Sequence, residues 1–540
     1  MAVARALACE DILVDVFENL APGSKLPRAS QLLVAARKKR QKTLARGACV
    51  CRAFSGPALQ VLWRVIDDVK HLFRILPSFA NASSNTILTG RVTKQDWARF
   101  QQYALRIEEL VVDDSVNFNS PIWTIVAHWN GARRPLLPRL RRLELPVDEK
   151  AAHTTILVPP ALDHLGLRMC KGYKTCWSFM KETLQPKLKS LRSLSVCQET
   201  TLWGRYLPDV GLIPRPWNLP QLQILQLHGI SSLTPSLLRT LSSIPCLRDL
   251  KINYGVEENT VYEDGVRYPF LSLETLALSS DLSSLAKILS MVSFAELRSV
   301  TIVARSRCHD LDSDISTHLV PVLSTLPPGL RYLHVALACK GCNVGHSLTP
   351  DALTGPLHSQ KELEDVSFRL RGFLGRIDMD EMLLTATESW PDLTSYELAF
   401  SFNDDDVQQY PRSPEAWHNR DGSLPRIATV IKLAECRPRL RQLHLPGIDL
   451  RVDLPSLTFI PALNHGLRSL DLSFLQKLQP LFELALILDK LFPNLDLMGA
   501  DDFAVVPYHP SSDPNLTIQM LRVMLLALQT GRRHTHGLEV

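Results

Sequence analysis

The sequence lacks the features of a membrane-spanning or secreted protein. It has no uninterrupted run of about 18 uncharged apolar residues, the length that a transmembrane helix needs. Its first apolar stretch is interrupted by Glu10, Asp11 and Asp15 and has no cleavage-site pattern, so no signal peptide is expected. The 11 cysteines are an odd number in mostly apolar surroundings, which favours buried thiols over a disulfide framework. These absences predict a cytoplasmic or nuclear protein without a membrane partner.

Motifs that would carry chemistry are also missing. The chain has no glycine-rich phosphate loop, no Gly-x-Ser-x-Gly and no His-Glu-x-x-His. Cys339 and Cys342, with His346 nearby, lack the second pair of ligands that a structural zinc site needs. The acidic run from Asp404 to Asp406 is typical of a solvated loop. We therefore predict no metal site, no cofactor and no catalytic residue, and we do not expect an enzyme.

Positively and negatively charged residues nearly balance. The chain has 60 Lys and Arg against 55 Asp and Glu, a formal net charge of +5 over 540 residues. So small an excess gives no general attraction to nucleic acid, and no mixture of basic and aromatic residues suited to single strands is present. The basic run from Arg37 to Arg40 fits a solvated loop or helix start, or else a nuclear-localisation or acidic-surface patch.

What the sequence does contain is a repeat. A chain of 540 residues is too long for one compact core and predicts several domains or an elongated repeat. The pattern Leu-x-x-Leu-x-Leu, with other apolar residues at some positions, recurs mostly at intervals of about 22 to 33 residues. The copies include Ile107/Leu110/Val112, Leu140/Leu143/Leu145, Leu162/Leu165/Leu167, Leu191/Leu194/Val196, Leu222/Leu225/Leu227, Leu247/Leu250/Ile252, Leu273/Leu276/Leu278, Leu297/Val300/Ile302, Leu330/Leu333/Val335, Leu363/Val366/Phe368, Leu393/Tyr396/Leu398, Leu440/Leu443/Leu445 and Leu467/Leu470/Leu472.

The repeat predicts an α/β fold. Amphipathic helical stretches lie between the copies, and a proline two residues before the first apolar position, as at Pro138 and Pro438, ends the preceding helix. Each strand can bury its leucines only against neighbouring strands, so a stack forms one continuous core. We expect a leucine-rich-repeat-like solenoid over residues 101–500 with a parallel sheet on its concave face. The alternative is that a leucine-rich chain matches so loose a pattern by chance. Residues 401–423 are expected to form a polar loop that projects from one face of the solenoid. Residues 501–540 are expected to form a capping helix and tail.

The N-terminal region has a different pattern. Residues 7–20 predict a helix with Ile12, Leu13, Val16, Phe17 and Leu20 on one face. Residues 44–63 contain two shorter helical patterns, and Ser55-Gly56-Pro57 predicts the break between them, since proline is tolerated at the first helical position. This apolar hairpin is too small to enclose a core of its own. It must be covered by another part of the chain or by a partner.

Three clusters in this region resemble the F-box motif, in the form found in basidiomycete fungi. They are the residues Leu7, Glu10, Ile12, Leu13, Phe17 and Leu20, then Val50 to Phe54, then Leu62 and Trp63. The sequence departs from the motif at Ala8 and Cys9, where the family has proline and its neighbour, and in the insertion 24–43. The resemblance implies a small all-α F-box-like domain over residues 1–77, followed by a linker over residues 78–100.

The resemblance also implies a function. F-box proteins bind a Skp-type adaptor and through it a cullin scaffold, while their repeats hold a protein substrate for ubiquitin conjugation. The chain would then be a non-catalytic substrate receptor of a ubiquitin ligase complex. Its adaptor-binding residues would be Leu7, Ile12, Leu13, Phe17, Leu20, Val50, Phe54, Leu62 and Trp63.

The residues themselves leave a second interpretation open. The alternative is a non-catalytic leucine-rich-repeat scaffold or binding protein whose N-terminal helices cap the solenoid. Outward exposure of the N-terminal apolar face would favour a partner site, and full burial would favour a cap.

Residues between the leucines are expected to face the concave surface and to bind the substrate, whose identity the sequence does not indicate. The candidates are Arg142, Lys251, Tyr332, His334 and Glu364. An arginine also follows the first apolar residue of seven copies, at Arg141, Arg192, Arg248, Arg298, Arg331, Arg441 and Arg468. These arginines form either a solvated rim or a ladder that binds an acidic partner surface.

Overall fold

The computed structural model describes twenty stretches of the chain. They are residues 9–21, 31–76, 79–82, 85–88, 91–112, 121–131, 134–147, 156–169, 189–198, 219–230, 232–255, 265–306, 311–339, 347–371, 376–401, 424–450, 454–463, 465–472, 481–497 and 514–537. Contacts divide the chain into two compact units, residues 1–247 and 248–540, which are described separately. This division does not coincide with the predicted boundaries after residues 77, 100 and 500.

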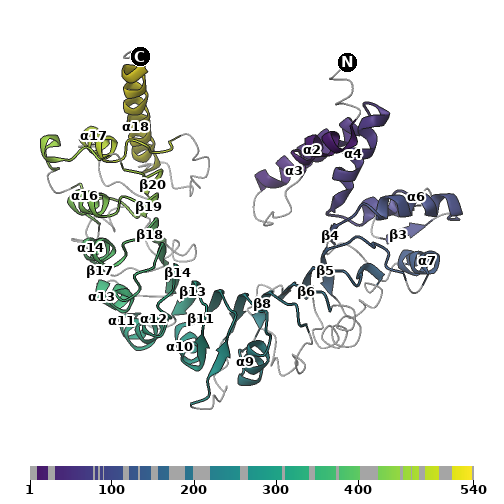
Figure 1. The fold of residues 1–540 in the computed structure, drawn as a ribbon, viewed down its shortest axis with the longest axis horizontal. Helices are drawn as coiled ribbons and strands as arrows, with labels where there is room; N and C mark the ends of the chain where they lie inside the picture. Colours follow the sequence, from purple (N-terminus) through teal and green to yellow (C-terminus); the bar gives the residue numbers. More distant parts are fainter. Residues whose placement is uncertain are drawn as a thin grey trace. The chain divides into compact units, whose positions relative to one another are not determined.

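The first unit begins with helices and continues with parallel strands (Figure 1). Its helices are α2 (Glu10–Glu18), α3 (Gln31–Ala48), α4 (Arg52–Arg64), α5 (Lys70–Phe73), α6 (Lys94–Ala104), α7 (Pro121–Asn130) and α9 (Pro235–Ser242). Its strands are β1 (Val65–Ile66), β2 (Phe79–Ala82), β3 (Asn85–Leu88), β4 (Glu109–Val111), β5 (Arg142–Val147), β6 (His164–Met169), β7 (Ser193–Gln198) and β8 (Ile224–Ile230).

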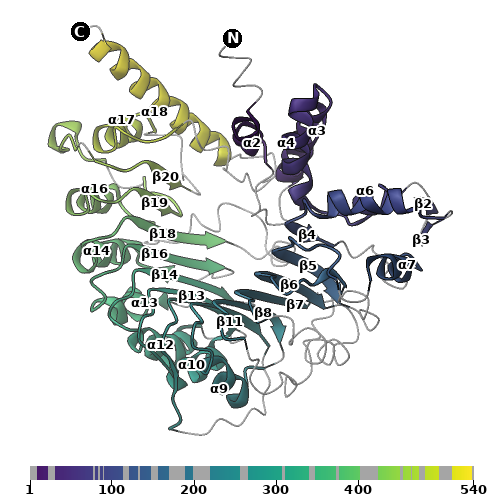
Figure 2. The same ribbon diagram turned by 45° about the vertical axis from the view of Figure 1, so that its right-hand side comes forward.

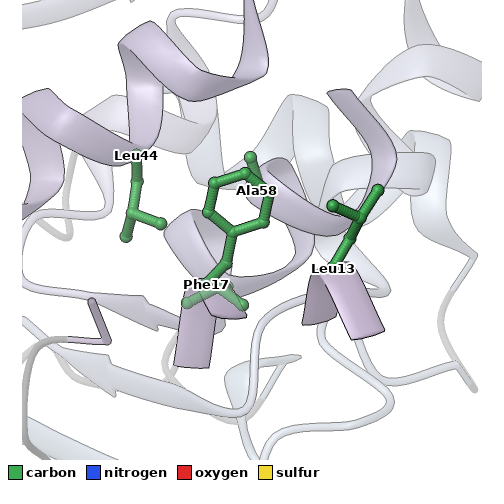
Figure 3. Packing of buried hydrophobic residues seen from close by; sticks show 5 residues of the cluster. Leu13, Phe17, Leu44 and Ala58 are labelled. Atoms are coloured by element: carbon green, nitrogen blue, oxygen red, sulfur yellow. The ribbon is translucent and has the colours of Figure 1, made fainter. Parts of the chain in front are cut away.

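Helices α2, α3 and α4 form a small hydrophobic cluster. Leu13 and Phe17 are four residues apart on α2, so they lie on one face of the helix and are buried together. The cluster is completed by Leu44 of α3 and by Ala58 and Val61 of α4. Figure 3 shows the Phe17 ring between Leu44 and Ala58. The acidic Glu10 and Asp11 lie in the first turn of α2, where their negative charges interact favourably with the positive end of the helix dipole.

The break between α3 and α4 lies earlier than predicted. Helix α3 ends at Ala48 and α4 begins at Arg52, so Ser55-Gly56-Pro57 is inside α4 and the predicted break at Pro57 is wrong. Proline at this position removes the hydrogen bond that its N–H would donate to the carbonyl of Ala53. Because Ala53 is exposed, water can satisfy that carbonyl and the helix continues.

The stretch predicted as a linker contains regular structure. Strands β2 and β3 pair antiparallel, and α6 begins with a capping box between Thr93 and Asp96. Trp97 and Phe100 of α6 are buried with their rings stacked at 4.8 Å, and Phe73 contacts Trp123 edge-to-face at 5.1 Å. These aromatic residues give the region a core of its own.

The other strands of the first unit run parallel, each beside the next along the chain. Strand β1 pairs with β4, and the ladder continues through β5, β6 and β7 to β8. The second leucine of each predicted copy falls in register with the next, and all are buried: Leu110, Leu143, Leu165, Leu194 and Leu225. Helix α4 runs directly into β1, so the helical cluster is continuous with the first strand.

The second unit alternates strands and helices. Its strands are β9 (Asp249–Tyr254), β10 (Tyr268–Phe270), β11 (Thr275–Asp281), β12 (Val292–Phe294), β13 (Ser299–Ser306), β14 (Tyr332–Cys339), β15 (Ser347–Leu348), β16 (Asp365–Arg371), β17 (Arg376–Ile377), β18 (Ser395–Ser401), β19 (Gln442–Leu445) and β20 (Ser469–Leu472). Its helices are α10 (Leu282–Met291), α11 (Leu311–Asp314), η4 (Ile315–Leu319), α12 (Val320–Ser324), α13 (Pro350–Thr354), η5 (Gly355–Leu357), α14 (Met379–Ser389), α16 (Ile427–Cys436), η7 (Leu457–Phe459), α17 (Leu481–Leu491) and α18 (Pro514–Gly537).

A parallel ladder organises this unit as well. It runs through β9, β11, β13, β14, β16, β18, β19 and β20, each paired with the next. Helices α10, α12, α13, α14 and α16 lie along one side of these strands (Figures 1 and 2). The leucines of the repeat point to the buried side and the intervening residues to the other, as the two-residue period of a strand requires. The prediction of an α/β fold with parallel strands is confirmed.

Trp390 illustrates how a helix is fixed to the sheet. It follows α14 and has no exposed surface, its Nε1–H donates to the Leu357 carbonyl at 3.2 Å, and its ring lies 6.3 Å from that of Tyr396 on β18. Burial of Tyr396 raises the pKa of its phenol above the ordinary value.

We expect Trp390→Phe to lower the free energy of unfolding by about 0.5–1.5 kcal/mol, because it removes one buried hydrogen bond to the Leu357 carbonyl, which keeps only the bond from the Gln360 N–H at 2.9 Å. Urea unfolding followed by circular dichroism measures the change. Trp97→Phe is the control, since the side chain of Trp97 makes ring contacts and no hydrogen bond among the residues that the structure describes. A loss for Trp390→Phe no larger than that of the control would contradict this role.

Candidate functional site

The N-terminal helical cluster has a set of exposed apolar side chains. Ile12 and Val16 lie four residues apart on α2 and are 46% and 52% exposed, and Val50 in the turn between α3 and α4 is 68% exposed. Leu13 and Phe17 occupy the adjoining, buried face of α2. The Cα of Gly47 lies so close to the Phe17 ring that an added Cβ would be 3.0 Å from it, which places the end of α3 against α2. Ile12, Val16 and Val50 are called the N-terminal apolar patch below.

The other predicted adaptor residues lie inward. Phe54 meets Phe17 edge-to-face at 5.7 Å, and Leu20 and Leu62 are partly buried against the cluster. The Trp63 ring lies 4.7 Å from that of Tyr103 on α6, tilted by 55°. Leu7 lies outside the described residues. Of the nine predicted adaptor-binding residues, Ile12 and Val50 are the exposed ones among those described. Leu13 and Phe17 are buried and stabilise the helical cluster.

An ion pair fixes the relative position of α2 and α4. The Arg64 guanidinium donates to both carboxylate oxygens of Glu18, one of the two bonds being 2.6 Å long. This hydrogen bond raises the pKa of Arg64 above its already high ordinary value. A bidentate pair of this kind restricts orientation as well as distance. It therefore sets the angle at which α2 presents Ile12 and Val16.

The basic run lies on a helix rather than in a loop. Arg37 of α3 contacts Asp67 at 3.7 Å, and Arg40 donates to the Ala21 carbonyl at 3.4 Å. Lys38 and Lys39 are exposed on α3. A helix start was one of the predicted alternatives for this run; the prediction of a nuclear-localisation patch stays open.

In the second unit, polar side chains occupy the strand face opposite the leucines. One transverse row contains the residue between the second and third apolar positions of successive copies. The paired registers place five of these residues side by side: His334 on β14, Ser367 on β16, Glu397 on β18, His444 on β19 and Asp471 on β20. We call them the polar row.

The polar row is connected by hydrogen bonds. His334 Nδ1 lies 2.8 Å from Ser367 Oγ, and Ser367 Oγ donates to Glu397 at 2.7 Å. Arg369 binds the same carboxylate with two bonds of 2.7 and 2.9 Å. Burial alone would raise the pKa of the Glu397 carboxyl, but the hydrogen bonds from Arg369 and Ser367 outweigh it and lower the pKa.

These contacts fix the tautomer of His334. A hydroxyl has one hydrogen, and Ser367 gives it to the ionised Glu397, so His334 Nδ1–H must be the donor to Ser367. Burial and the nearby charge of Arg369 lower the pKa of His334, which keeps its ring neutral. The Nε2 atom of His334 is thus a hydrogen-bond acceptor. In this arrangement His334 does not accept the Ser367 proton, so the pair is not a nucleophile with its base.

The far end of the row carries a second histidine. His444 Nδ1 lies 3.1 Å from Asp471 and 3.9 Å from Glu397. Two ionised carboxylates offer acceptors only, so the nitrogen between them holds a hydrogen. The row therefore has a fixed order of donors and acceptors across five strands. Such an array suits the recognition of polar groups on an extended partner.

The predicted substrate-binding residues are distributed over both units. Tyr332 is exposed on β14, and its hydroxyl lies 3.4 Å from Glu364, which also pairs with Arg331 at 3.2 Å. Lys251 on β9 is in the same register as His334 but separated from it by β11 and β13, and it pairs with Asp249 at 3.7 Å. Arg142 belongs to the first unit and pairs with Glu144 at 2.8 Å. The structure thus brings Tyr332, His334 and Glu364 into one area.

The substrate prediction did not include the rest of the polar row. Ser367, Glu397, His444 and Asp471 hold the same position of the repeat as His334, so aligning the copies would have placed them in one row. The hydrogen bonds that connect them depend on side-chain rotamers, which the spacing of residues in the sequence does not predict.

Several other sequence features fall partly outside the described residues. These are Cys342 and His346, and residues 402–423 of the predicted polar loop. In the stretches that are described, no group of three or more His, Cys, Asp or Glu is placed to hold a metal ion. Likewise, no helix in those stretches is long and apolar enough to cross a membrane.

Comparison with known proteins adds no family assignment. No family model matches the chain, and no curated protein matches it either. The properties of the two candidate sites therefore come from their own residues.

The low pKa of Glu397 predicts a pH-dependent contribution to stability. A carboxyl whose pKa is lowered by folding stabilises the protein above its unfolded pKa, and this contribution is lost as the pH falls through the folded value. We expect Glu397→Gln to cost about 0.5–1.5 kcal/mol at neutral pH. The difference from the wild type should shrink below a pH of about 4.

Urea midpoints measured from neutral pH down to the acid limb check this. Glu388→Gln is the matched control, because Glu388 is mostly exposed and contacts Lys432 at 3.7 Å. Equal midpoints for wild type and Glu397→Gln at neutral pH would refute the role of the polar row in stability.

Proposed function

We propose that this protein is a substrate-receptor subunit of a Skp–cullin–F-box type ubiquitin ligase. Its N-terminal helices would bind a Skp-type adaptor, and a leucine-rich-repeat-like solenoid would bind the target protein. The ubiquitin-transfer chemistry would take place on other subunits. This chain would raise the effective concentration of target lysines near the charged conjugating enzyme.

The N-terminal apolar patch is the observation that carries the proposal. Exposed Ile12, Val16 and Val50 stand on a helical cluster that is held together by buried apolar side chains such as Leu13, Phe17 and Leu44. Ile12 and Val16 lie one turn apart on α2, and exposed apolar groups gathered in this way are typical of a protein-binding site. Ile12 and Val50 belong to the residues by which the sequence resembles the F-box motif. The mostly apolar character of the patch fits a stable subunit contact.

The strand face of the second unit supports the other half of the proposal. The side chains opposite the leucines include the polar row and the exposed Tyr332, in fixed register on a face that helices α10 to α16 do not cover (Figure 2). Tyr332, His334 and Glu364 lie together there and offer an aromatic ring, an acceptor and a charge. A target protein would be recognised by such a mixed surface.

A second function has its own observation. Trp63 packs against Tyr103 of α6, and α4 runs directly into β1 and the parallel ladder. This continuity supports a non-catalytic leucine-rich-repeat scaffold whose N-terminal helices cap the strands. In that case the apolar patch would have no Skp-type partner.

The test is co-elution of the full chain with a Skp-type adaptor in size-exclusion chromatography. We expect the wild type to co-elute, and Ile12→Asp with Val50→Asp to abolish co-elution, because a charge in a buried contact remains unpaired. Both positions are exposed, so the double variant keeps its fold, which circular dichroism verifies.

Val523→Asp is the matched control. Val523 is 65% exposed on α18, far along the sequence from the patch, and its substitution should leave co-elution unchanged. A wild type that is folded and does not co-elute favours the scaffold function instead.

A further inference from the structure

A cavity of about 280 Å³ lies at the C-terminal end of the second unit. It is bounded by Arg468 just before β20, by the segment that follows α17 and by helix α18. The side chains that matter for its chemistry are Arg468, Asp496, Leu497, Leu526, Gln529 and Thr530. Arg522 of α18 donates from Nε to the Leu497 carbonyl at 2.9 Å, and Arg532 pairs with Asp489. The helix is therefore fixed where it closes the cavity.

Two arginines of like charge lie side by side at this end. The backbone N–H of Arg468 donates to the carbonyl of Arg441 at 2.8 Å, so the two residues occupy adjacent chain segments about 4.8 Å apart. Both are exposed, and neither has an ion pair with any residue that the structure describes. Adjacent like charges repel each other, so an arriving anion relieves that repulsion. Asp496 leaves a net charge of +1 on the three residues.

Gln529 supplies a second, independent indication of a ligand. Its side chain is 5% exposed, and its Nε2 has no hydrogen-bond partner within the described part of the chain. A buried amide donor without an acceptor is unfavourable, so an acceptor that enters the cavity is favoured. Oxygen and nitrogen exchange places when the amide turns by half a rotation, so the donor can face the cavity when an acceptor enters.

The remaining walls define what else the ligand carries. Thr530 gives its hydroxyl hydrogen to the Leu526 carbonyl at 2.7 Å, which leaves its oxygen as an acceptor for an N–H group. Leu526 is 37% exposed, and with Leu497 it offers apolar surface. The cavity is smaller than the roughly 300–1,000 Å³ of sites for drug-sized molecules. Its volume fits one or two side chains of a peptide.

We propose that this cavity, with Arg441 and Arg468 at its edge, binds an acidic peptide segment of a partner protein. A carboxylate of the segment lies between the two arginines, and an apolar side chain next to it enters the cavity against Leu497 and Leu526. Gln529 donates to a peptide carbonyl, and Thr530 accepts from a peptide N–H. The site is independent of the N-terminal apolar patch, so it holds whether or not the adaptor proposal does.

The test is fluorescence anisotropy on the full chain with two labelled peptides. One has the sequence Gly-Glu-Leu-Glu-Leu-Gly, and the other has glutamine in place of each glutamate. We expect saturable binding of the acidic peptide, weakened by added sodium chloride, and at least about tenfold weaker binding of the neutral one. The double variant Arg441→Glu, Arg468→Glu should weaken binding of the acidic peptide by at least about tenfold, and Gln529→Ala should weaken it several-fold.

Arg239→Glu is the control, because Arg239 is an exposed arginine on helix α9 of the first unit. It makes one of the same charge changes and should leave peptide binding unchanged. Thermal unfolding verifies that the arginine variants are folded, and Arg468→Gln provides a milder substitution if the double variant is not. Absence of saturable binding, equal binding of both peptides, or equal weakening by Arg239→Glu would each overturn the proposal. Adaptor co-elution is measured separately, so failure of one proposal is distinct from failure of the other.

Discussion

The structure depends on one constraint, which is that no strand of the ladder can bury its apolar residues alone. Leu333 of β14 is covered because Val300 and Val366 lie in register on either side of it and helices cover the row. The same holds for each copy along the ladder. Since a strand alternates its side chains, burial of the leucines sends every intervening residue to the opposite face. The core therefore determines which residues are available for contact.

The face opposite the leucines is also restricted in the residues that it can carry. Ser367 is only 5% exposed although it lies on the polar side, because His334 and Glu397 enclose it. A buried hydroxyl without partners would destabilise the sheet, whereas a fully bonded one makes its neighbours rigid. The polar row is thus compatible with the fold only as a connected set. Its donors and acceptors are already oriented before a partner binds.

Sequence reasoning succeeded where periodicity is enforced by burial. The leucine copies located the parallel strands, and helices such as α9 and α14 lie between copies, where amphipathic stretches predicted them. It failed at Pro57, because an exposed carbonyl at Ala53 lets a helix tolerate a proline that usually ends one. It also missed α6, where two aromatic residues, Trp97 and Phe100, supply a core that a count of apolar residues undervalues. The hydrogen bonds of the polar row depend on rotamers and contacts across the sheet.

The two proposed contact surfaces differ in the physics of their binding. Ile12, Val16 and Val50 gain free energy by leaving water, at about 25 cal/mol for each Å² of apolar surface, and salt barely affects this term. Arg441 and Arg468 act through charge, which salt screens over about 10 Å at 0.1 M. An apolar patch gives a contact that persists, whereas an exposed charged pair speeds encounter and favours exchange. The two proposals together therefore describe a chain with one lasting contact and one partner that exchanges.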